Sequence, residues 1–139
     1  MISQSVWLKC GPEAAFALFA ARIGEWWPGG HRPSREASSV VRLEQSGRFW
    51  ETTVDGREFE MGRVLEWVDG ERLCLAFYLG TGADQPTDVV IRFVAEGEGT
   101  RVTVEHGPGG VALAMWELRA PRFEENWGIV LRLVTGVLR

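Results

Sequence analysis

The feature that most constrains this chain is a series of short segments in which apolar and polar residues alternate. They cover residues 38–45, 47–54, 58–68, 72–79, 87–96 and 100–107, and an earlier one covers residues 3–9. Alternation with a period of two is typical of strands that bury one face. The dipeptides Ser46-Gly47, Asp55-Gly56 and Asp69-Gly70 separate the first four of the six consecutive segments and favour tight turns. Six consecutive strands joined by hairpins predict an antiparallel meander, to which residues 3–9 add a seventh strand.

Two other parts of the chain follow a helical period. Residues 11–27 carry Pro12 at a first helical position, with Phe16 and Ile23 on one apolar stripe. Gly24 ends this helix, so that residues 25–27 form a second short turn before a Pro-Gly-Gly breaker. Residues 117–138 predict one long helix. Its apolar stripe contains Phe123, Trp127, Val130 or Leu131, Val134 and Leu138.

These elements predict an α+β fold in a single domain, residues 1–139. A curved antiparallel sheet of six to seven strands has one apolar face to cover. The helix at residues 117–138 is the only element long enough to lie across that face. Two short helices after the first strand would close one end of the molecule.

Composition excludes several classes of partner. The net charge is −4, and acidic and basic residues are mixed along the chain, so neither nucleic acid nor an anionic membrane is the expected partner. No apolar stretch approaches the roughly 18 residues of a membrane span, and the first residues do not resemble a signal peptide. Cys10 and Cys74 are far apart, and two histidines are too few for a zinc site. We therefore expect a cytoplasmic protein with reduced cysteines and no metal or other cofactor.

Five sequence motifs, in this order, resemble those of a known family. They are SVWLKCGPEAAFALF, IGEWWP, SGRFWETTVDGREFEMGRVLEWVDGERLCLAF, GTRVTVEHGP and ENWGIVLRLV. The pattern is similar to the family named for the activator of the heat-shock-protein-90 ATPase, which belongs to the SRPBCC (START/Bet v-like) superfamily of helix-grip domains. Two positions depart from it: Ser46 and Asn126 stand where the family usually has glycine. The resemblance implies a helix-grip fold with a cavity between the sheet and the long helix.

Alternation along the strands and the stripe of the long helix identify the side chains that would line such a cavity. The candidate ligand-binding residues are Trp26, Trp27, Phe49, Glu51, Phe59, Met61, Leu75, Phe77, Ile91, His106, Trp116, Phe123 and Trp127. Trp116 would precede the long helix at the rim of the cavity. The alternative is that these aromatic and aliphatic residues form a packed core, and a shift of one residue in register would exchange the two faces.

Four of these side chains have two possible roles. Glu51 and His106 are ionisable groups on an apolar face, so each needs a partner or water. In the first role, Glu51 and His106 would orient a ligand, and Glu51 would pair with Arg63 or His106. In the second role, each would lie at a strand end and face solvent. Of Trp26 and Trp27, one would seal the cavity, and the other would cover the outside of the turn or meet a partner. Two further indoles, Trp7 and Trp50, alternate onto the outer face of the sheet, where their exposure would favour a homodimer.

Three functions remain open at this point. The first is a module that binds a small apolar molecule, with Glu51 and His106 as polar anchors. The second is a protein-interaction module, similar to the chaperone activator in its surface. The third is a cyclase or hydrolase that uses Glu51 and His106 as acid and base. We rank catalysis last, because no other catalytic motif is present in the sequence.

Overall fold

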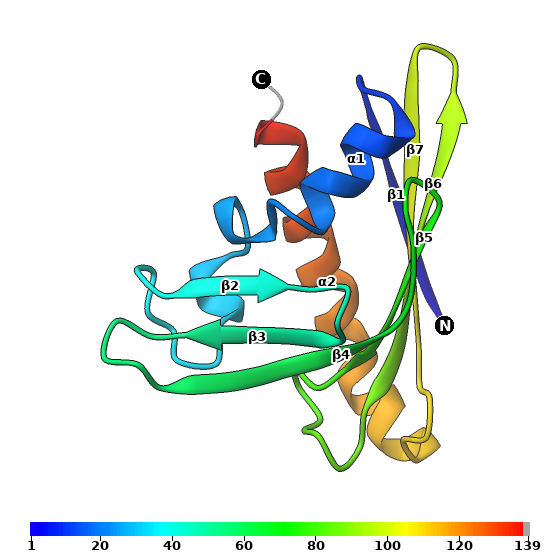
Figure 1. Ribbon diagram of the computed structural model, residues 1–139. Coiled ribbons are helices and arrows are strands. Elements are labelled where there is room, and N and C mark those ends of the chain that lie inside the picture. The colour runs from blue at the N-terminus through cyan, green and yellow to red at the C-terminus, as the bar shows by residue number, and fades with distance from the viewer. Residues whose placement is uncertain (138–139) are drawn as a thin grey trace.

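Seven strands and several short helices precede one long helix in the computed structural model, which describes residues 1–137 (Figure 1). The elements are β1 (Ile2–Leu8), the α-helix α1 (Pro12–Phe19), the 3-10 helices η1 (Ile23–Glu25) and η2 (Gly29–His31), β2 (Val40–Leu43), β3 (Arg48–Thr52), β4 (Glu58–Val68), β5 (Arg72–Phe77), β6 (Thr87–Glu96), β7 (Gly99–Gly107) and the α-helix α2 (Leu113–Val137). This order is the predicted one, with η2 added in a segment expected to be irregular. Leu138, which we assigned to the helical stripe, lies outside the described residues.

All seven strands form one antiparallel sheet in the order β1-β7-β6-β5-β4-β3-β2. The predicted meander is confirmed, because β2 to β7 each pair with the next strand along the chain. β1 forms the other edge of the sheet and pairs with β7, from Ile2 opposite His106 to Leu8 opposite Thr100. The turns at Gly47, Gly56 and Gly70 have φ values of 124°, 90° and 74°, which side chains other than glycine rarely adopt.

The sheet bends sharply within β4. The register shifts between Phe49 and Trp50 on one side of this strand and between Val64 and Glu66 on the other. Gly62 lies at the bend, where a Cβ atom would approach the carbonyl oxygen of Ala76 to 2.5 Å. Glycine therefore allows the backbones of two strands to come together there. Beyond the bend, β2, β3 and the first part of β4 turn away from the plane of the remaining strands (Figure 1).

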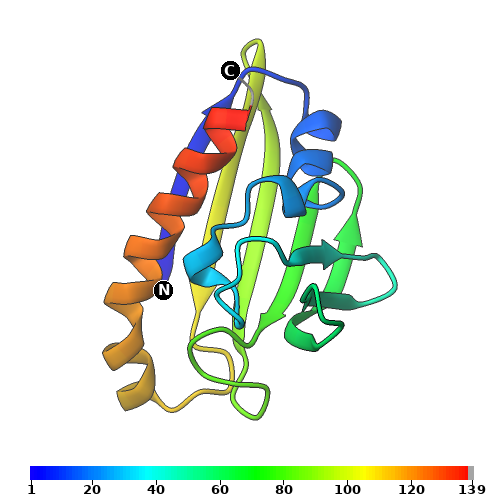
Figure 2. The same cartoon turned by 90° about the vertical axis from the view of Figure 1, so that its left-hand side faces the viewer.

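The concave face of the sheet is covered by helices. In Figure 2, α2 lies along β1 and β7, and α1 with η1 and η2 lies in front of the other strands. α2 buries Trp116, Phe123, Trp127, Val130, Leu131 and Val134 against the core. The prediction that Trp116 precedes the helix is wrong, since α2 begins at Leu113 and Trp116 packs in its first turn. Pro121 lies inside α2, although a proline commonly marks a helix boundary.

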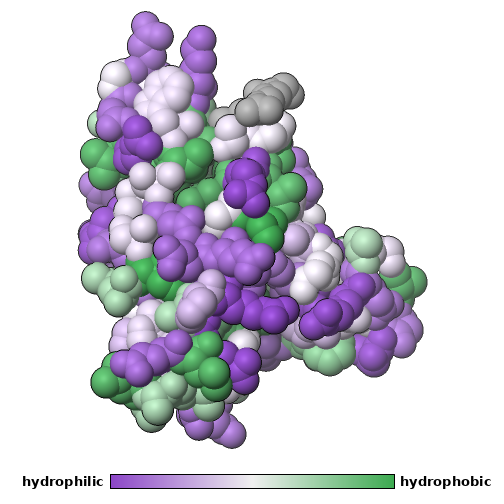
Figure 3. All heavy atoms as spheres, turned by 180° about the vertical axis from the view of Figure 1, so that it is seen from behind, coloured by the Kyte–Doolittle hydropathy of each residue, from purple (hydrophilic) through white to green (hydrophobic). Residues whose placement is uncertain are grey.

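The outer face of the sheet does not carry the expected pair of exposed indoles. Trp50 is only 6% exposed, and the guanidinium of Arg48 lies over its ring, 4.2 Å from the ring centre. Trp7 is 38% exposed, and its Nε1 donates to the carbonyl oxygen of Glu96. Figure 3 views the molecule from behind Figure 1, with the sheet edge-on, and on that side hydrophobic residues form small groups separated by hydrophilic ones. The assignment of Trp50 as an exposed residue is therefore wrong, and the homodimer stays a prediction without that patch.

Candidate functional site

The adjacent tryptophans after η1 both point into the molecule. Trp26 is 6% exposed, and its Nε1 donates to the carbonyl oxygen of Leu18 at 2.7 Å. Trp27 is 5% exposed, and its Nε1 donates to the carbonyl oxygen of His31 at 3.2 Å. The prediction that one of them faces outward is wrong, because the turn after Glu25 is irregular and sends the two indoles to different interior partners. Trp26 packs against Phe19 of α1, whereas Trp27 makes T-shaped contacts with Phe49 and Trp127.

Trp27 forms part of the wall of an open cavity of about 550 Å³. The cavity lies between α2, the segment that holds η2, and the chain that follows β5; Figure 2 shows the η2 segment beside α2. Its apolar wall consists of Trp27, Pro33, Phe77, Leu79, Phe123, Trp127 and Val130. Its other lining residues are Gly30, His31, Arg32, Arg35, Gly80, Arg119, Arg122 and Asn126. This size and this mixture of one apolar wall with a few polar groups are typical of a small-molecule site.

The structure brings only some of the predicted site residues to this cavity. Trp27, Phe77, Phe123 and Trp127 line it. A deeper group surrounds a void of only about 10 Å³ and is packed core; this group includes Trp26, Phe49, Leu75 and Ile91. Met61 is fully buried in the core, and Trp116 is buried against His106 and Phe123. Phe59 is half-buried on β4, beyond the bend, with the guanidinium of Arg57 5.7 Å from its ring centre.

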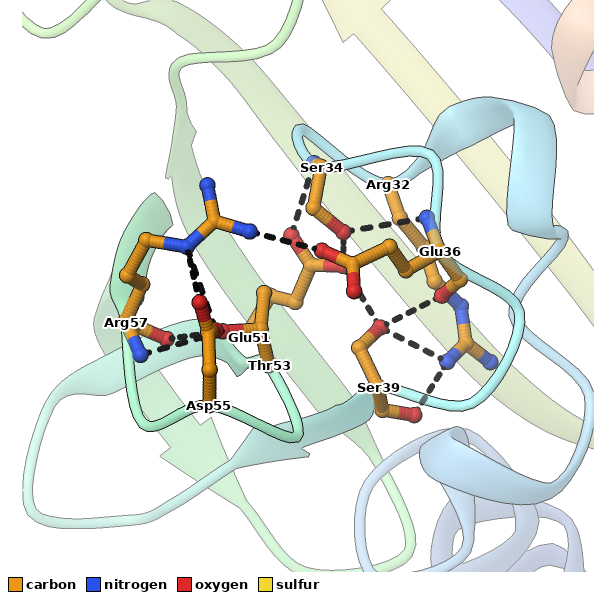
Figure 4. A network of polar contacts seen from close by, with 8 residues as sticks. All are labelled: Arg32, Ser34, Glu36, Ser39, Glu51, Thr53, Asp55 and Arg57. Atoms are coloured by element: carbon orange, nitrogen blue, oxygen red, sulfur yellow. Dashed lines mark hydrogen bonds and ion pairs between the residues drawn. The ribbon is translucent and has the colours of Figure 1, made fainter.

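Glu51 is fully buried and holds the loop between η2 and β2 (Figure 4). Its carboxylate accepts hydrogen bonds from the Ser34 backbone N–H at 2.9 Å and from the Ser34 and Ser39 hydroxyls at 2.5 Å each. Burial alone would raise the pKa of Glu51. The hydrogen bonds from Ser34 and Ser39, with the nearby charge of Arg32, outweigh burial and lower this pKa below its ordinary value. The expected pairing with Arg63 or His106 is wrong, because Arg63 is exposed and His106 has other partners.

The same loop carries two arginines to the cavity. Arg32 is 7% exposed, and its guanidinium donates to the backbone carbonyls of Trp27 and Ser39 and to the Ser39 hydroxyl. Ser39 thus joins Arg32 to Glu51 (Figure 4). Arg35 follows with a φ of 61°, a left-handed conformation that is uncommon for a residue other than glycine. The Glu51 carboxylate therefore holds this loop at Ser34 and at Ser39, and Arg32 and Arg35 of the same loop line the cavity.

His106 lies behind the aromatic wall as a neutral imidazole. Trp127 Nε1 donates to its Nδ1 at 2.9 Å, so its proton is on Nε2, which lies 2.7 Å from Thr87 Oγ1. The Thr87 hydroxyl then donates to the carbonyl oxygen of Phe77. Burial lowers the pKa of His106 to about 4. Neither Glu51 nor His106 lines the cavity, and their hydrogen bonds go to different partners, so the geometry does not make them an acid–base pair.

Two further properties bear on what the site can hold. Within residues 1–137, no three His, Cys, Asp or Glu side chains converge in a way that would hold a metal ion. In the same part of the chain, no helix combines the length and the apolar character that crossing a membrane requires.

Comparison with known proteins identifies the family. The sequence matches the family described as activator of Hsp90 ATPase homolog 1-like protein over residues 10–138. The chain belongs to this family. The resemblance read from the five sequence motifs is thereby confirmed. Comparison with curated proteins gives no match.

Solved structures share the fold over 99% of the chain. CalC, a self-sacrificing resistance protein from Micromonospora echinospora, superposes with a TM-score of 0.78 at 22% identity, covering 99% of this chain and 92% of CalC. Protein NE0264 from Nitrosomonas europaea has a TM-score of 0.68 at 17% identity, covering 99% and 92%. The Aha1 dimer from Colwellia psychrerythraea has a TM-score of 0.62 at 12% identity, covering 99% and 94%. At these identities the likeness shows the fold, and the predicted helix-grip architecture is confirmed.

In this member of the family, sequence reasoning missed the polar lining of the cavity. Arg119, Arg122 and Asn126 are three and seven residues apart along α2, so they share the side of the helix that carries Phe123 and Trp127. This spacing could have placed the three polar residues beside the cavity. A helical stripe defined by apolar residues alone leaves them out. Arg32 and Arg35 lie in a loop without periodicity, and no pattern in the sequence places them beside α2.

Proposed function

We propose that the protein binds a small, largely apolar molecule in the cavity between the sheet and α2. The observation that carries this proposal is the 550 Å³ cavity, whose wall includes the rings of Trp27, Phe77, Phe123 and Trp127. An aromatic wall of this kind removes much apolar surface of a ligand from water, which is the main source of affinity in such sites. Family membership supports the proposal at the level of the fold alone, because one fold carries many functions.

The protein-interaction hypothesis is the alternative to ligand binding. It draws on the name of the family, which refers to activation of the Hsp90 ATPase. A packed interior would favour it, whereas this chain has an open cavity of ligand size. The catalytic hypothesis loses the pair of residues on which it depended, because Glu51 and His106 each serve a separate hydrogen-bond network.

Gly30 offers a way to block the cavity without disturbing the core. It lines the cavity, and a Cβ atom added to it would meet no other atom within 4 Å. We expect N-phenyl-1-naphthylamine, a neutral apolar dye, to bind the wild-type protein saturably and to raise its unfolding temperature. The Gly30→Trp variant should bind the dye at least about tenfold more weakly, because the indole would occupy the cavity opening. Fluorescence titration and thermal unfolding measure both effects.

Gly110 provides the matched control. It too has no atom within 4 Å of an added Cβ, and it is not a lining residue. Gly110→Trp should bind the dye as the wild type does. Absence of saturable binding to the wild type, or equal binding by wild type and Gly30→Trp, would reject the cavity as the binding site. The protein-interaction hypothesis would then become the first choice.

A further inference from the structure

The charges around the cavity are all of one sign. Arg32, Arg35, Arg119 and Arg122 line it, and no aspartate or glutamate does. This is unusual in a chain whose net charge is −4. The two pairs of arginines come from different elements, the loop after η2 and the helix α2, so that they approach the cavity from two sides.

The four cavity arginines lack the carboxylate partners that most arginines elsewhere in the described chain have. Several arginines outside the cavity contact a carboxylate at 3.4 Å or less: Arg22, Arg48, Arg57, Arg72, Arg92 and Arg101. Within residues 1–137, none of the four cavity arginines forms such an ion pair. Arg32 is buried, makes its hydrogen bonds within the loop, and lies close enough to Glu51 to lower the pKa of that carboxyl. Among the described residues, the exposed guanidiniums of Arg35, Arg119 and Arg122 form no ion pair, so their donors are available to another group.

The neighbouring polar side chains do not reduce this positive charge. Asn126 is uncharged. The pKa of His31 is lowered by burial and by the charge of Arg122, although a hydrogen bond with Asn126 acts in the opposite direction. His31 is therefore neutral near pH 7. The cavity combines an aromatic wall with three free guanidiniums, each of which presents several N–H donors to an anion.

We propose that the ligand of this cavity is an amphipathic anion, with an apolar body and one carboxylate, sulfonate or phosphate group. This inference rests on the proposed function and specifies its ligand class. The apolar body lies against Phe77, Phe123 and Trp127, and the anionic group lies among Arg35, Arg119 and Arg122 at the opening. Arg32 is a positioning residue, because its own hydrogen bonds hold the loop that presents Arg35.

Two dyes with the same rings test the charge requirement. 8-Anilinonaphthalene-1-sulfonate carries a sulfonate that N-phenyl-1-naphthylamine lacks. We expect the sulfonate to bind the wild type about tenfold more tightly at low salt, since hydrogen bonds to charged groups are the stronger class. Raising the ionic strength to about 1 M should remove most of that difference, because the guanidiniums at the opening are exposed to screening. The affinity of the neutral dye should change little with salt.

Arginine variants locate the effect. In R119Q/R122Q, the affinity for the sulfonate should fall to that of the neutral dye, whose own affinity should stay within about twofold of the wild type. R132Q is the matched control, because Arg132 is an exposed arginine of α2 that does not line the cavity and forms no carboxylate pair in residues 1–137. It should bind both dyes as the wild type does. Equal unfolding temperatures without dye would show that the variants are folded alike.

The outcomes distinguish this inference from the proposed function. If both dyes bind the wild type with equal affinity, or if R119Q/R122Q keeps the preference for the sulfonate, the cavity binds apolar molecules without regard to charge and the inference is overturned. If R132Q loses the preference as fully as R119Q/R122Q, the effect belongs to the net charge of α2, and the inference is likewise overturned. If neither dye binds the wild type, the proposed function fails, and the ligand class fails with it.

Discussion

At the scale of single residues, His106 shows how a buried titratable group is held in one protonation state. Its Nδ1 accepts from Trp127 and its Nε2 faces Thr87, so protonation of Nδ1 would place two N–H donors against each other. The rings packed against it belong to Phe77, Trp116, Phe123 and Trp127, none of which is charged. Burial lowers its pKa to about 4 for this reason.

The pKa of His106 predicts a pH dependence of folding. In the unfolded chain a histidine takes up a proton below about pH 6.5. In the folded protein His106 does so only near pH 4. Its contribution to stability is therefore complete above pH 6.5 and is lost as the pH falls towards 4, by a total on the order of 3 kcal/mol. Urea unfolding between pH 4 and 7 should show this slope, and H106Q should reduce it.

His31 provides the control for that measurement. It is partly buried, and its pKa is also lowered, so H31Q should remove only its own smaller contribution to the slope. Nitrogen-15 NMR of the His106 ring gives the tautomer and the pKa directly. A proton on Nδ1, or a titration midpoint at or above 6.5, would contradict the hydrogen-bond arrangement described for His106.

At the scale of elements, the loop from Arg32 to Ser39 is a part of the site whose contacts could not be predicted from the sequence. Alternation along β3 correctly placed Glu51 on the inner face, with 0% of its surface exposed. Its partners could not be predicted, because Ser34 and Ser39 lie in a loop where no periodic pattern relates sequence position to direction. Strands and helices repeat their geometry, so their inner faces can be read from the sequence. A loop takes its path from individual hydrogen bonds such as those of Glu51.

Removal of the Glu51 charge should loosen this loop. In E51Q, an amide nitrogen would replace one of the oxygens that accept from Ser34 and Ser39, at a cost of roughly 1–3 kcal/mol in unfolding free energy. Hydrogen–deuterium exchange in residues 32–39 should become faster, above all at the Ser34 amide that donates to Glu51. The pKa of Glu51 is lowered, so this stabilisation is present above about pH 4.5 and is lost in acid as the pH falls through the folded pKa.

E36Q is the control within the same loop. Glu36 pairs with Arg57 at 3.0 Å on the surface, where such pairs contribute little to stability. Exchange at the Ser34 amide should therefore stay as in the wild type. Equal protection in E51Q and the wild type would mean that the loop is held by contacts other than the Glu51 carboxylate.

At the scale of the whole molecule, the meander and the covering helix could be predicted because their signals extend over many residues. Two features could not be read in this way. The bend at Gly62 depends on a close approach between backbones, which alternation does not encode. The cavity lies where side chains of the inner face are not covered by others, and alternation does not encode this. Phe77 and Trp127 border the open cavity, whereas Ile91, which was also predicted to face inward, borders only a small void in the core.

Trp127 contributes to the stability of the whole molecule, because its ring contacts three parts of the chain that are distant in sequence. It packs against Trp27 after η1 and Phe77 of β5, and it donates to His106 of β7. Trp127→Ala should lower the unfolding free energy by ~3–5 kcal/mol, as large core truncations do. Trp127→Phe keeps a buried ring but leaves Nδ1 of His106 without its donor, so its cost should be smaller, about 1–3 kcal/mol. Denaturant unfolding followed by far-ultraviolet circular dichroism and by tryptophan fluorescence should give one coincident transition for each variant. Loss of less than about 1 kcal/mol in Trp127→Ala would show that α2 is held to the sheet without this side chain.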